Sequence, residues 1–220
     1  MLPTFTNQQL LTTALTHRSA LNENPGLSPE SNERLEFLGD AVLELVTTEY
    51  LFTTYPDEPE GELTAYRSAL VKTTTLAQAA TGLKLGSMLH MSKGEETTGG
   101  RESIGLLANT MEALIGALYL DQGYNACVSF IQEHVLWRID EIINKKLYKD
   151  PKSNLQEVVQ AEGLETPTYE VLKETGPDHD KQFIVGVYVD GELTGKGTGK
   201  SKQEAQRSAA TKALSVVQKR

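Results

Sequence analysis

The chain has 220 residues, of which 39% are hydrophobic and one is a cysteine. That length is enough for one medium-sized domain and a smaller one, and the lone Cys127 excludes an intrachain disulfide framework and fits a reducing compartment. The net charge of −9 argues at first against a nucleic-acid partner, because acidic proteins repel polyanions.

The charge is not uniform along the chain. Residues 1–150 contain 11 Lys and Arg against 20 Asp and Glu, whereas residues 181–220 contain 8 against 3. Acidic clusters hold cations and basic clusters bind polyanions, although ordinary surface charge explains about half of such asymmetries. The chain has neither 18 consecutive apolar residues nor a signal-peptide pattern at its start, so we expect a cytoplasmic protein without a membrane segment.

The first domain is predicted to be all-α and to cover residues 1–146. Apolar residues recur there at spacings of three and four from Leu10 to Ile143, and β-branched alternation is scarce. Turn-forming residues interrupt the pattern at 24–26, 55–59 and 94–100.

After a charged linker at residues 147–152, a small domain is predicted at 153–218. A short helix precedes a strand that begins at Tyr169, and apolar residues then alternate from Phe183 to Val189. Asp190-Gly191 is a hairpin signal. The order helix, three strands, helix indicates a compact α+β domain.

The last helix of the small domain has a start signal of its own. Ser201 precedes it with Glu204 three residues later, as in a capping box. Its alanines, from Ala205 to Ala213, are small enough to lie close to the sheet. We interpret Gly195, Gly197 and Gly199 as loosening the end of the third strand.

An acidic helix is predicted over residues 33–52. At about 100° per residue, Glu33, Glu36 and Asp40 fall within roughly 60° of one another, and Leu35, Leu38, Val42 and Leu45 are expected on the opposite, core-facing side. Two carboxylates at ~4 Å repel by about 4 kcal/mol at an effective dielectric near 20. A hard cation such as Mg²⁺ removes that repulsion, but the spacing alone more often marks a solvated acidic face, as we expect for Glu44.

Two further features lie near these acids. Phe37 stands beside them, where it either packs under a loop of its own chain or meets a second subunit. On the apolar helix predicted at 104–120, Asn109 and Glu112 share a face with Gly105 and Gly116, and these small residues would allow a close helix crossing. Asn109 and Glu112 would then meet Glu36 and Asp40, although such a pair is more often structural.

These segments together resemble a known family. ERLEFLGDAVLEL (33–45), THRSA (16–20) and MEALIGALYLDQGY (111–124) resemble motifs of the ribonuclease III family. NLQEVVQ (154–160) and GKGTGKSKQEAQRSAA (195–210) resemble a double-stranded RNA-binding domain. The similarity covers nearly the whole chain.

The resemblance implies a homodimeric endonuclease that cuts double-stranded RNA, including ribosomal precursors, with one metal site and one cut strand per subunit. Mg²⁺ is the implied cofactor, Mn²⁺ is a possible substitute, and no small-molecule cofactor is expected. Asp40 and Glu112 would lie closest to the chemistry, and Phe37 would lie in the dimer interface. The implied metal site comprises Glu36, Asp40, Asn109 and Glu112, and the outer acidic residues are Glu33 and Glu60.

By the same resemblance, the small domain would read RNA shape across the minor groove and the phosphates. The family often has basic residues where this chain has Gln203 and Gln206, which predicts weaker phosphate binding. The implied RNA-binding residues are Gln156, Glu157, His179, Lys200 and Lys202. The sequence shows no metal-ligand spacing among its histidines, and we interpret His17 as a structural polar residue.

Asn109 is the departure that leaves an alternative open, because the family usually has aspartate there. An asparagine still offers a carbonyl oxygen but carries no charge, so a weaker metal site is expected. The main hypothesis is an active nuclease, and the second is a dimeric RNA binder with impaired catalysis. A third, an all-α metalloenzyme acting on small phosphates, leaves the second domain unexplained.

Overall fold

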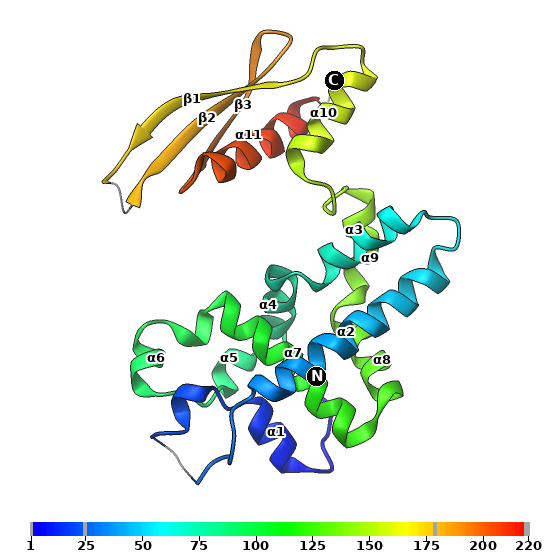
Figure 1. Ribbon diagram of the computed structural model, residues 1–220, viewed down its shortest axis with the longest axis vertical. Coiled ribbons are helices and arrows are strands. Elements are labelled where there is room, and N and C mark those ends of the chain that lie inside the picture. The colour runs from blue at the N-terminus through cyan, green and yellow to red at the C-terminus, as the bar shows by residue number, and fades with distance from the viewer. Residues whose placement is uncertain (1, 24–25, 178–179, 218–220) are drawn as a thin grey trace. The chain divides into compact units, whose positions relative to one another are not determined.

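The computed structural model describes residues 2–23, 26–177 and 180–217, which form two compact units (Figure 1). The first unit is Met1–Tyr148 and the second is Lys149–Arg220. The division falls within the segment predicted as a linker. His179 lies outside the described residues.

The first unit is helical, as predicted. In its described part, nine α-helices are joined by short loops and three 3₁₀ turns. The helices are α1 (Gln8–Ala14), α2 (Glu33–Thr54), α3 (Glu60–Val71), α4 (Thr73–Gly82), α5 (Leu85–Met88), α6 (Lys93–Thr97), α7 (Ile104–Gln122), α8 (Tyr124–His134) and α9 (Ile139–Asn144). The 3₁₀ turns are η1 (Arg18–Ala20), η2 (Gly100–Glu102) and η3 (Leu136–Arg138).

Helix α7 is the centre of this unit and crosses α2 at very short range. A Cβ atom on Gly39 would lie 1.7 Å from the Glu112 carbonyl oxygen, and one on Gly116 would lie 2.2 Å from the Leu35 carbonyl oxygen. Glycine is therefore required on both sides of the crossing. The predicted close crossing is confirmed at Gly116. The prediction was wrong for Gly105, because a Cβ atom there would meet nothing within 4 Å.

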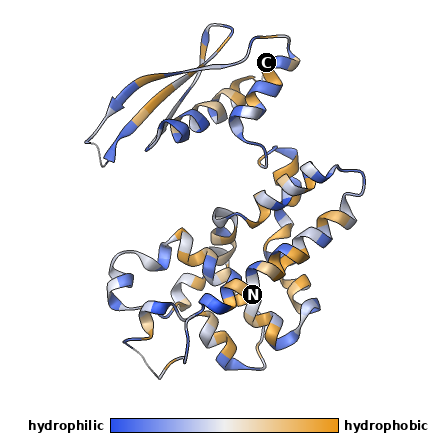
Figure 2. Cartoon of the chain, in the orientation of Figure 1, coloured by the Kyte–Doolittle hydropathy of each residue, from blue (hydrophilic) through white to orange (hydrophobic). Residues whose placement is uncertain are grey.

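Leu35 and Val42 are buried as predicted, but the crossing extends the buried face of α2 toward the acids. Gly39 and Leu43, which neighbour Glu36 around the helix, are buried against the core, so the acids flank the buried face instead of opposing it. Leu45, predicted to face the core, is 59% exposed. The mixture of polar and apolar residues along α2 and α7 is visible in Figure 2.

Helix α7 is also the one helix in the described part of the chain that is long and apolar enough to cross a membrane by length and composition alone. More than half of it is buried within the first unit. The same length and composition are found in the core helix of a globular domain, and its contacts with α2 and α4 give it that place here.

The second unit has the predicted order of one helix, three antiparallel strands and a final helix. Strand β2 is central, and Asp190 and Gly191, both with positive φ, form the tight turn that follows it. The elements are α10 (Pro151–Ala161), β1 (Thr168–Thr175), β2 (Gln182–Val189), β3 (Glu192–Gly199) and α11 (Lys202–Val217).

The glycines of β3 have a different role from the predicted one. A Cβ on Gly197 would lie 2.1 Å from the backbone nitrogen of Ala209, and one on Gly195 would lie 2.6 Å from the Ala209 carbonyl oxygen. They do not loosen the strand end. They let the buried alanine face of α11, which was correctly predicted, lie directly on the sheet.

Candidate active site and RNA-binding surface

The close crossing of α2 and α7 brings Glu36, Asp40 and Glu112 together. Glu112 is partly buried, and this burial, followed by the charges of Asp40 and then Glu36, raises its pKa to about 7. Burial next to other carboxylates disfavours ionisation. The juxtaposition predicted from helical spacing is therefore present.

Asn109 contacts the same cluster through a side-chain hydrogen bond to Glu36. An ionised carboxylate only accepts, so the Asn109 amide is the donor. Burial and the charge of Glu33 raise the pKa of Glu36, and this hydrogen bond opposes the rise. An aspartate at position 109 would instead add a further negative charge beside Glu36.

Two acids near the cluster, Glu33 and Glu44, have cationic partners, whereas the described residues provide none for the three central acids. Arg18 Nη1 lies 3.4 Å from Glu33 Oε1, and Arg67 Nε lies 3.0 Å from Glu44 Oε2. Glu44 is therefore ion-paired rather than merely solvated. In the described part of the chain, no Lys or Arg forms an ion pair with Glu36, Asp40 or Glu112. The negative charge of this cluster therefore has no counter-ion among the residues that the structure describes.

The donor chemistry of the cluster fits a hard divalent cation, because it consists of carboxylate oxygens and one amide oxygen. Among the residues with described positions, no three His, Cys, Asp or Glu side chains are arranged closely enough to hold a metal ion together. Burial, followed by the charges of neighbouring carboxylates, raises the pKa of both Glu36 and Glu112.

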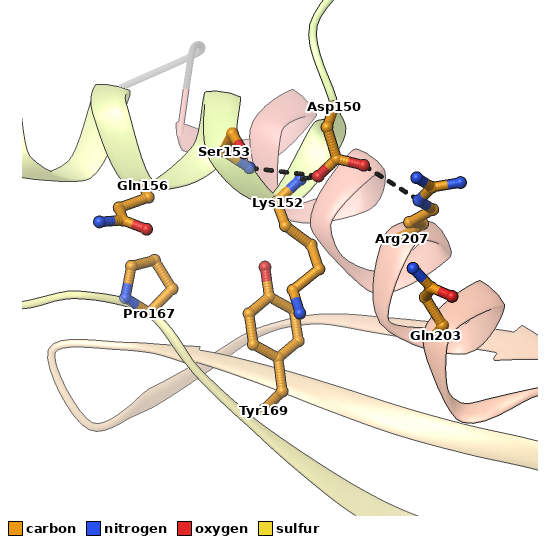
Figure 3. Close-up of a pocket in the computed structure, with 8 residues that line it drawn as sticks. All are labelled: Asp150, Lys152, Ser153, Gln156, Pro167, Tyr169, Gln203 and Arg207. Atoms are coloured by element: carbon orange, nitrogen blue, oxygen red, sulfur yellow. Dashed lines mark hydrogen bonds and ion pairs between the residues drawn. The ribbon is translucent and has the colours of Figure 1, made fainter.

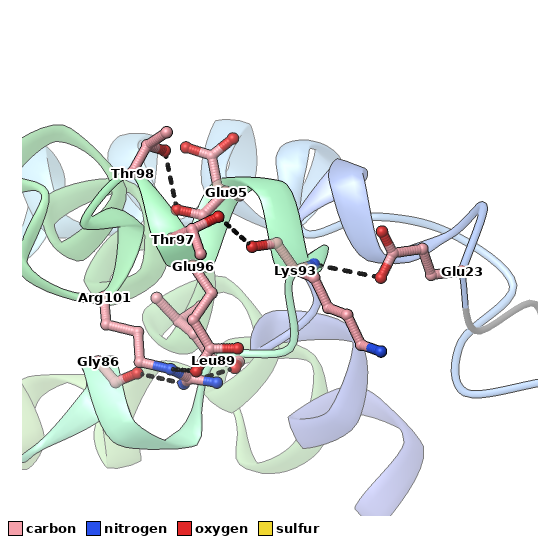
Figure 4. Close-up of polar contacts among 9 residues, drawn as sticks. All are labelled: Glu23, Gly86, Leu89, Lys93, Glu95, Glu96, Thr97, Thr98 and Arg101. Carbon is pink, nitrogen blue, oxygen red and sulfur yellow. Dashed lines mark hydrogen bonds and ion pairs between the residues drawn. The ribbon is translucent and has the colours of Figure 1, made fainter.

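A cavity of about 310 Å³ opens beside the cluster. Its polar walls include Glu36 and Asn109 as well as residues of the loop after α1. Leu89, another wall residue, is held in place because Arg101 donates to its carbonyl oxygen at 3.0 Å and to that of Gly86 at 2.8 Å (Figure 4). The lining residues are His17, Arg18, Asn32, Glu33, Glu36, Leu89, Leu106, Asn109 and Thr110.

Sequence reasoning missed the part that His17 and Arg18 play in this cavity. Both belong to the THRSA segment, which carried the family resemblance without a chemical role. Their separation in sequence from Glu36 left no periodic signal that could join them to it.

Glu60 and Phe37 lie differently from the three central acids. Glu60 is in the first turn of α3, where its Oε1 accepts a hydrogen bond of 3.0 Å from Thr64 Oγ1. No described contact joins Glu60 to the cluster of the same chain. Phe37 is 82% exposed, so no described loop covers it. That Phe37 contacts a second subunit remains a prediction.

In the second unit, the predicted RNA-binding residues whose positions are described lie on the surface. Lys200 and Lys202 are exposed at the start of α11, and Gln156 and Glu157 are exposed on α10. Ser201 Oγ accepts from the Glu204 amide at 3.1 Å, as predicted, while the Glu204 carboxylate accepts from the Lys200 amide at 2.8 Å. This cap fixes the two lysines beside the positive end of the helix dipole.

A polar cavity of about 560 Å³ separates the starts of α10 and α11 (Figure 3). Lys152 reaches across it, with Nζ donating to Gln206 Oε1 at 2.8 Å and lying 4.8 Å from the centre of the Tyr169 ring. Arg207 Nε lies 3.0 Å from Asp150 Oδ2. Lys152 of α10 and Arg207 of α11 therefore lie near Gln203 and Gln206. At these two positions the sequence alone predicts weaker phosphate binding.

Comparisons with known proteins identify the two units separately. Residues 7–139 match the family model described as ribonuclease-III-like, and residues 151–217 match the double-stranded RNA binding motif. The chain belongs to the ribonuclease III family. Family membership makes it a double-stranded-RNA-specific endoribonuclease from a metal-dependent family.

Relatives within the ribonuclease III family align over nearly their whole length. Ribonuclease 3 of Desulforamulus reducens is 47% identical over 208 residues, covering 94% of this chain and 85% of the relative. Ribonuclease 3 of Bacillus cytotoxicus is 48% identical over 211 residues, covering 96% and 86%. The solved nuclease domain of ribonuclease III from Campylobacter jejuni, for which a region involved in dimer formation is described, is 40% identical with a TM-score of 0.54, covering 60% of this chain and 90% of that one.

Proposed function

We propose that this chain is a Mg²⁺-dependent endoribonuclease that hydrolyses double-stranded RNA, one strand per subunit of a homodimer. The observation that carries the proposal is the cluster of Glu36, Asp40 and Glu112, which has no protein counter-ion among the described residues. It occurs in a chain that also contains a double-stranded RNA binding motif. Mn²⁺, another hard oxygen-seeking cation, is the expected substitute.

In this proposal, Glu36, Asp40, Asn109 and Glu112 hold the cation at the crossing of α2 and α7. A bound divalent cation polarises the phosphate and offsets the charge that develops during hydrolysis. Asp40 and Glu112 lie closest to the reacting phosphate, whereas Glu33 and Glu60 form an outer acidic shell. Because Gly39 and Gly116 fix the helix crossing, the acids are held on rigid elements.

The homodimer would form through the exposed side of α2. Phe37, Leu45 and Phe52 are 82%, 59% and 71% exposed and lie within roughly 80° of one another around the helix. Exposed apolar stripes of this kind mark interaction surfaces. The described dimer-forming region of the Campylobacter jejuni nuclease domain supports this assembly.

The deciding experiment is cleavage of a long RNA duplex with Mg²⁺, followed by sizing of the products. We expect shortened duplexes that require the cation and disappear with a chelator. The second candidate, an RNA binder with impaired catalysis, is favoured only by Asn109, whose amide is already bonded to Glu36. Tight duplex binding with no cleavage at any Mg²⁺ concentration would establish that candidate instead.

Replacing Asn109 by aspartate is expected to strengthen the cation site. The substitution removes the amide donor and adds a negative charge. After mutual repulsion of the carboxylates is subtracted, we expect a net gain of roughly 1–2 kcal/mol, or about tenfold in affinity. A Mg²⁺ titration of the cleavage rate should show a midpoint about tenfold lower.

The matched control for Asn109→Asp is Asn125→Asp, which adds the same charge at an exposed position of α8. Its midpoint should equal that of the parent. An unchanged midpoint in Asn109→Asp would mean that position 109 does not take part in cation binding.

The RNA-binding surface is proposed to include Gln156, Glu157 and His179 at minor grooves and Lys200 and Lys202 at phosphates. Loss of each phosphate contact lowers the slope of log affinity against log salt by about 1. We expect the double variant Lys200→Ala/Lys202→Ala to lower this slope by about 2. We expect Lys152→Ala to lower it by about 1, because Lys152 supplies charge beside Gln206.

The control for these lysines is Lys212→Ala, an exposed position of α11 that does not line the cavity of Figure 3. Binding is measured with uncut duplex in the absence of divalent cations. An unchanged slope in the Lys200/Lys202 double variant would contradict the assignment. An unchanged slope in Lys152→Ala would restrict the proposed phosphate contacts to Lys200 and Lys202 at the start of α11.

We further propose that the substrates include ribosomal and other structured RNA precursors and that the protein acts in the cytoplasm. The reduced, buried Cys127 is consistent with a reducing compartment. Sequencing of RNA ends in cells depleted of the protein tests the substrates, because uncut ribosomal precursors should accumulate.

A further inference from the structure

The cavity beside the acidic cluster contains a histidine whose free ring nitrogen is a hydrogen-bond donor. His17 N-caps the 3₁₀ turn η1, where its Nδ1 accepts from the Ser19 amide at 3.3 Å and lies 2.8 Å from Ser19 Oγ. An Nδ1 atom that accepts from an amide carries no proton. The neutral ring therefore carries its proton on Nε2.

The position of His17 is fixed from two sides. Its amide donates to the His90 carbonyl oxygen at 2.9 Å, and Ser19 Oγ in turn accepts from the Ser92 amide at 3.0 Å. The ring is thus held by backbone of both the α1–α2 segment and the α5–α6 segment. For the described residues, no hydrogen bond to Nε2 is present.

The surroundings of His17 match the chemistry of an RNA strand. The same cavity is lined by Glu36 and Asn109 of the acidic cluster and by Arg18, whose side chain is 72% exposed. A strand whose phosphate lies at the cluster therefore has its neighbouring nucleotide within reach of the fixed Nε2 donor of His17 and the guanidinium of Arg18. Oxygen acceptors on a ribose or a phosphate are the groups that such a pair recognises.

We propose that His17 is a positioning residue that donates from Nε2 to a ribose or phosphate oxygen of the nucleotide next to the cut. This inference rests on the proposed function and deepens it, because it assigns a substrate subsite to a cavity outside the central acids. Correct placement of the reacting phosphate contributes strongly to rate. Loss of the contact should therefore reduce cleavage without affecting the fold.

The test variant is His17→Asn. Asparagine is a good N-cap, so it keeps an acceptor for the Ser19 amide while removing the Nε2 donor. His90→Asn is the matched control, because His90 contributes backbone hydrogen bonds to the same region and its side chain does not line the cavity. We expect kcat/KM on an all-RNA duplex to fall about tenfold for His17→Asn and to stay unchanged for His90→Asn.

Modified duplexes separate substrate contact from a structural role and identify the acceptor. Single 2′-deoxy nucleotides or single methylphosphonate linkages are placed on either side of the cut. If His17 contacts the altered oxygen, the two losses are not additive, and parent and His17→Asn become equal on that duplex. Equality on a deoxy duplex assigns the ribose, and equality on a methylphosphonate duplex assigns the phosphate.

Two results would overturn the inference while leaving the proposed function intact. One is cleavage by His17→Asn at the parental rate. The other is the same loss on every duplex, modified or not, which indicates a structural role. If the parent itself fails to cleave, the proposed function fails. The Kd of the parent and that of His17→Asn are then compared on the same set of duplexes. An equal Kd for parent and His17→Asn on the all-RNA duplex then overturns the inference as well.

Discussion

Glu112→Gln is expected to abolish cleavage and to leave binding of duplex RNA within about twofold of the parent. The glutamine has the same size but removes a charge from the cluster that would hold the cation, where electrostatic stabilisation of the reacting phosphate is large. We expect the single-turnover rate to fall by at least about 1,000-fold. Binding is carried mainly by phosphate and groove contacts of the second unit, which this substitution does not touch.

The control is Glu133→Gln, the same substitution on α8 in the first unit, which should cleave normally. Binding of both variants is measured by a mobility shift with uncut duplex. Residual cleavage by Glu112→Gln within tenfold of the parent would remove Glu112 from the proposed chemistry.

The same substitution makes a prediction about stability. The pKa of Glu112 is about 7 in the folded protein, against an ordinary value of 4.5. The folded state therefore binds more protons than the unfolded state between these values, and stability is lost as pH rises from about 4.5 to about 7. The full shift corresponds to about 3 kcal/mol, which we reduce to about 1–2 kcal/mol because the side chain keeps solvent contact.

Without divalent cations, Glu112→Gln should consequently raise the Tm at pH 8 by roughly 3–6 °C. At pH 4.5 the two proteins should melt together. Added Mg²⁺ should raise the Tm of the parent more than that of the variant, since it binds the folded parent better. Equal Tm values at pH 8 without cations would show that the carboxylate is not destabilised by its neighbours.

Phe37→Ala is expected to dissociate the proposed homodimer. A twofold axis places two copies of the residue in one interface, and burial of each ring contributes on the order of 3 kcal/mol. The dimer Kd should rise by two to four orders of magnitude, given about tenfold per 1.4 kcal/mol. Analytical ultracentrifugation across nanomolar to micromolar concentrations measures this change directly.

Trp137→Ala is the control for Phe37→Ala, because Trp137 is also largely exposed, at 66%, but lies away from α2 in η3. It should leave the dimer intact. A parent that sediments as a monomer at micromolar concentration would contradict the assembly, and so would a Phe37→Ala dimer of parental strength.

Local sequence signals were sufficient for much of the fold. The spacing of apolar residues predicted an all-α first domain, and the alternation from Phe183 to Val189 predicted the central strand of the second. Asp190-Gly191 and the cap formed by Ser201 and Glu204 were also correct. Each depends on neighbours within a few residues, where backbone preference and side-chain reach decide the outcome.

Helical periodicity was less successful at assigning faces. It placed Glu36 and Asp40 together, but it put Leu45 in the core and the acids opposite the buried side. A helix wheel gives relative angles and says nothing about where the partner helix lies. In this protein, Leu35 and Val42 are buried as predicted, but α7 packs against Gly39, which brings the buried face next to the acids and leaves Leu45 exposed.

The sequence by itself determined the two-domain order, the acidic first part and the basic end of the chain, and the residue types for a cation site, because these follow from composition, spacing and motif. Tertiary structure alone decided that Leu45 lies outside the core, that Gly195 and Gly197 admit α11, and that His17 enters the cavity beside the acids. These features involve residues distant in the chain, and they depend on how closely two backbones approach, which no local pattern of side chains specifies.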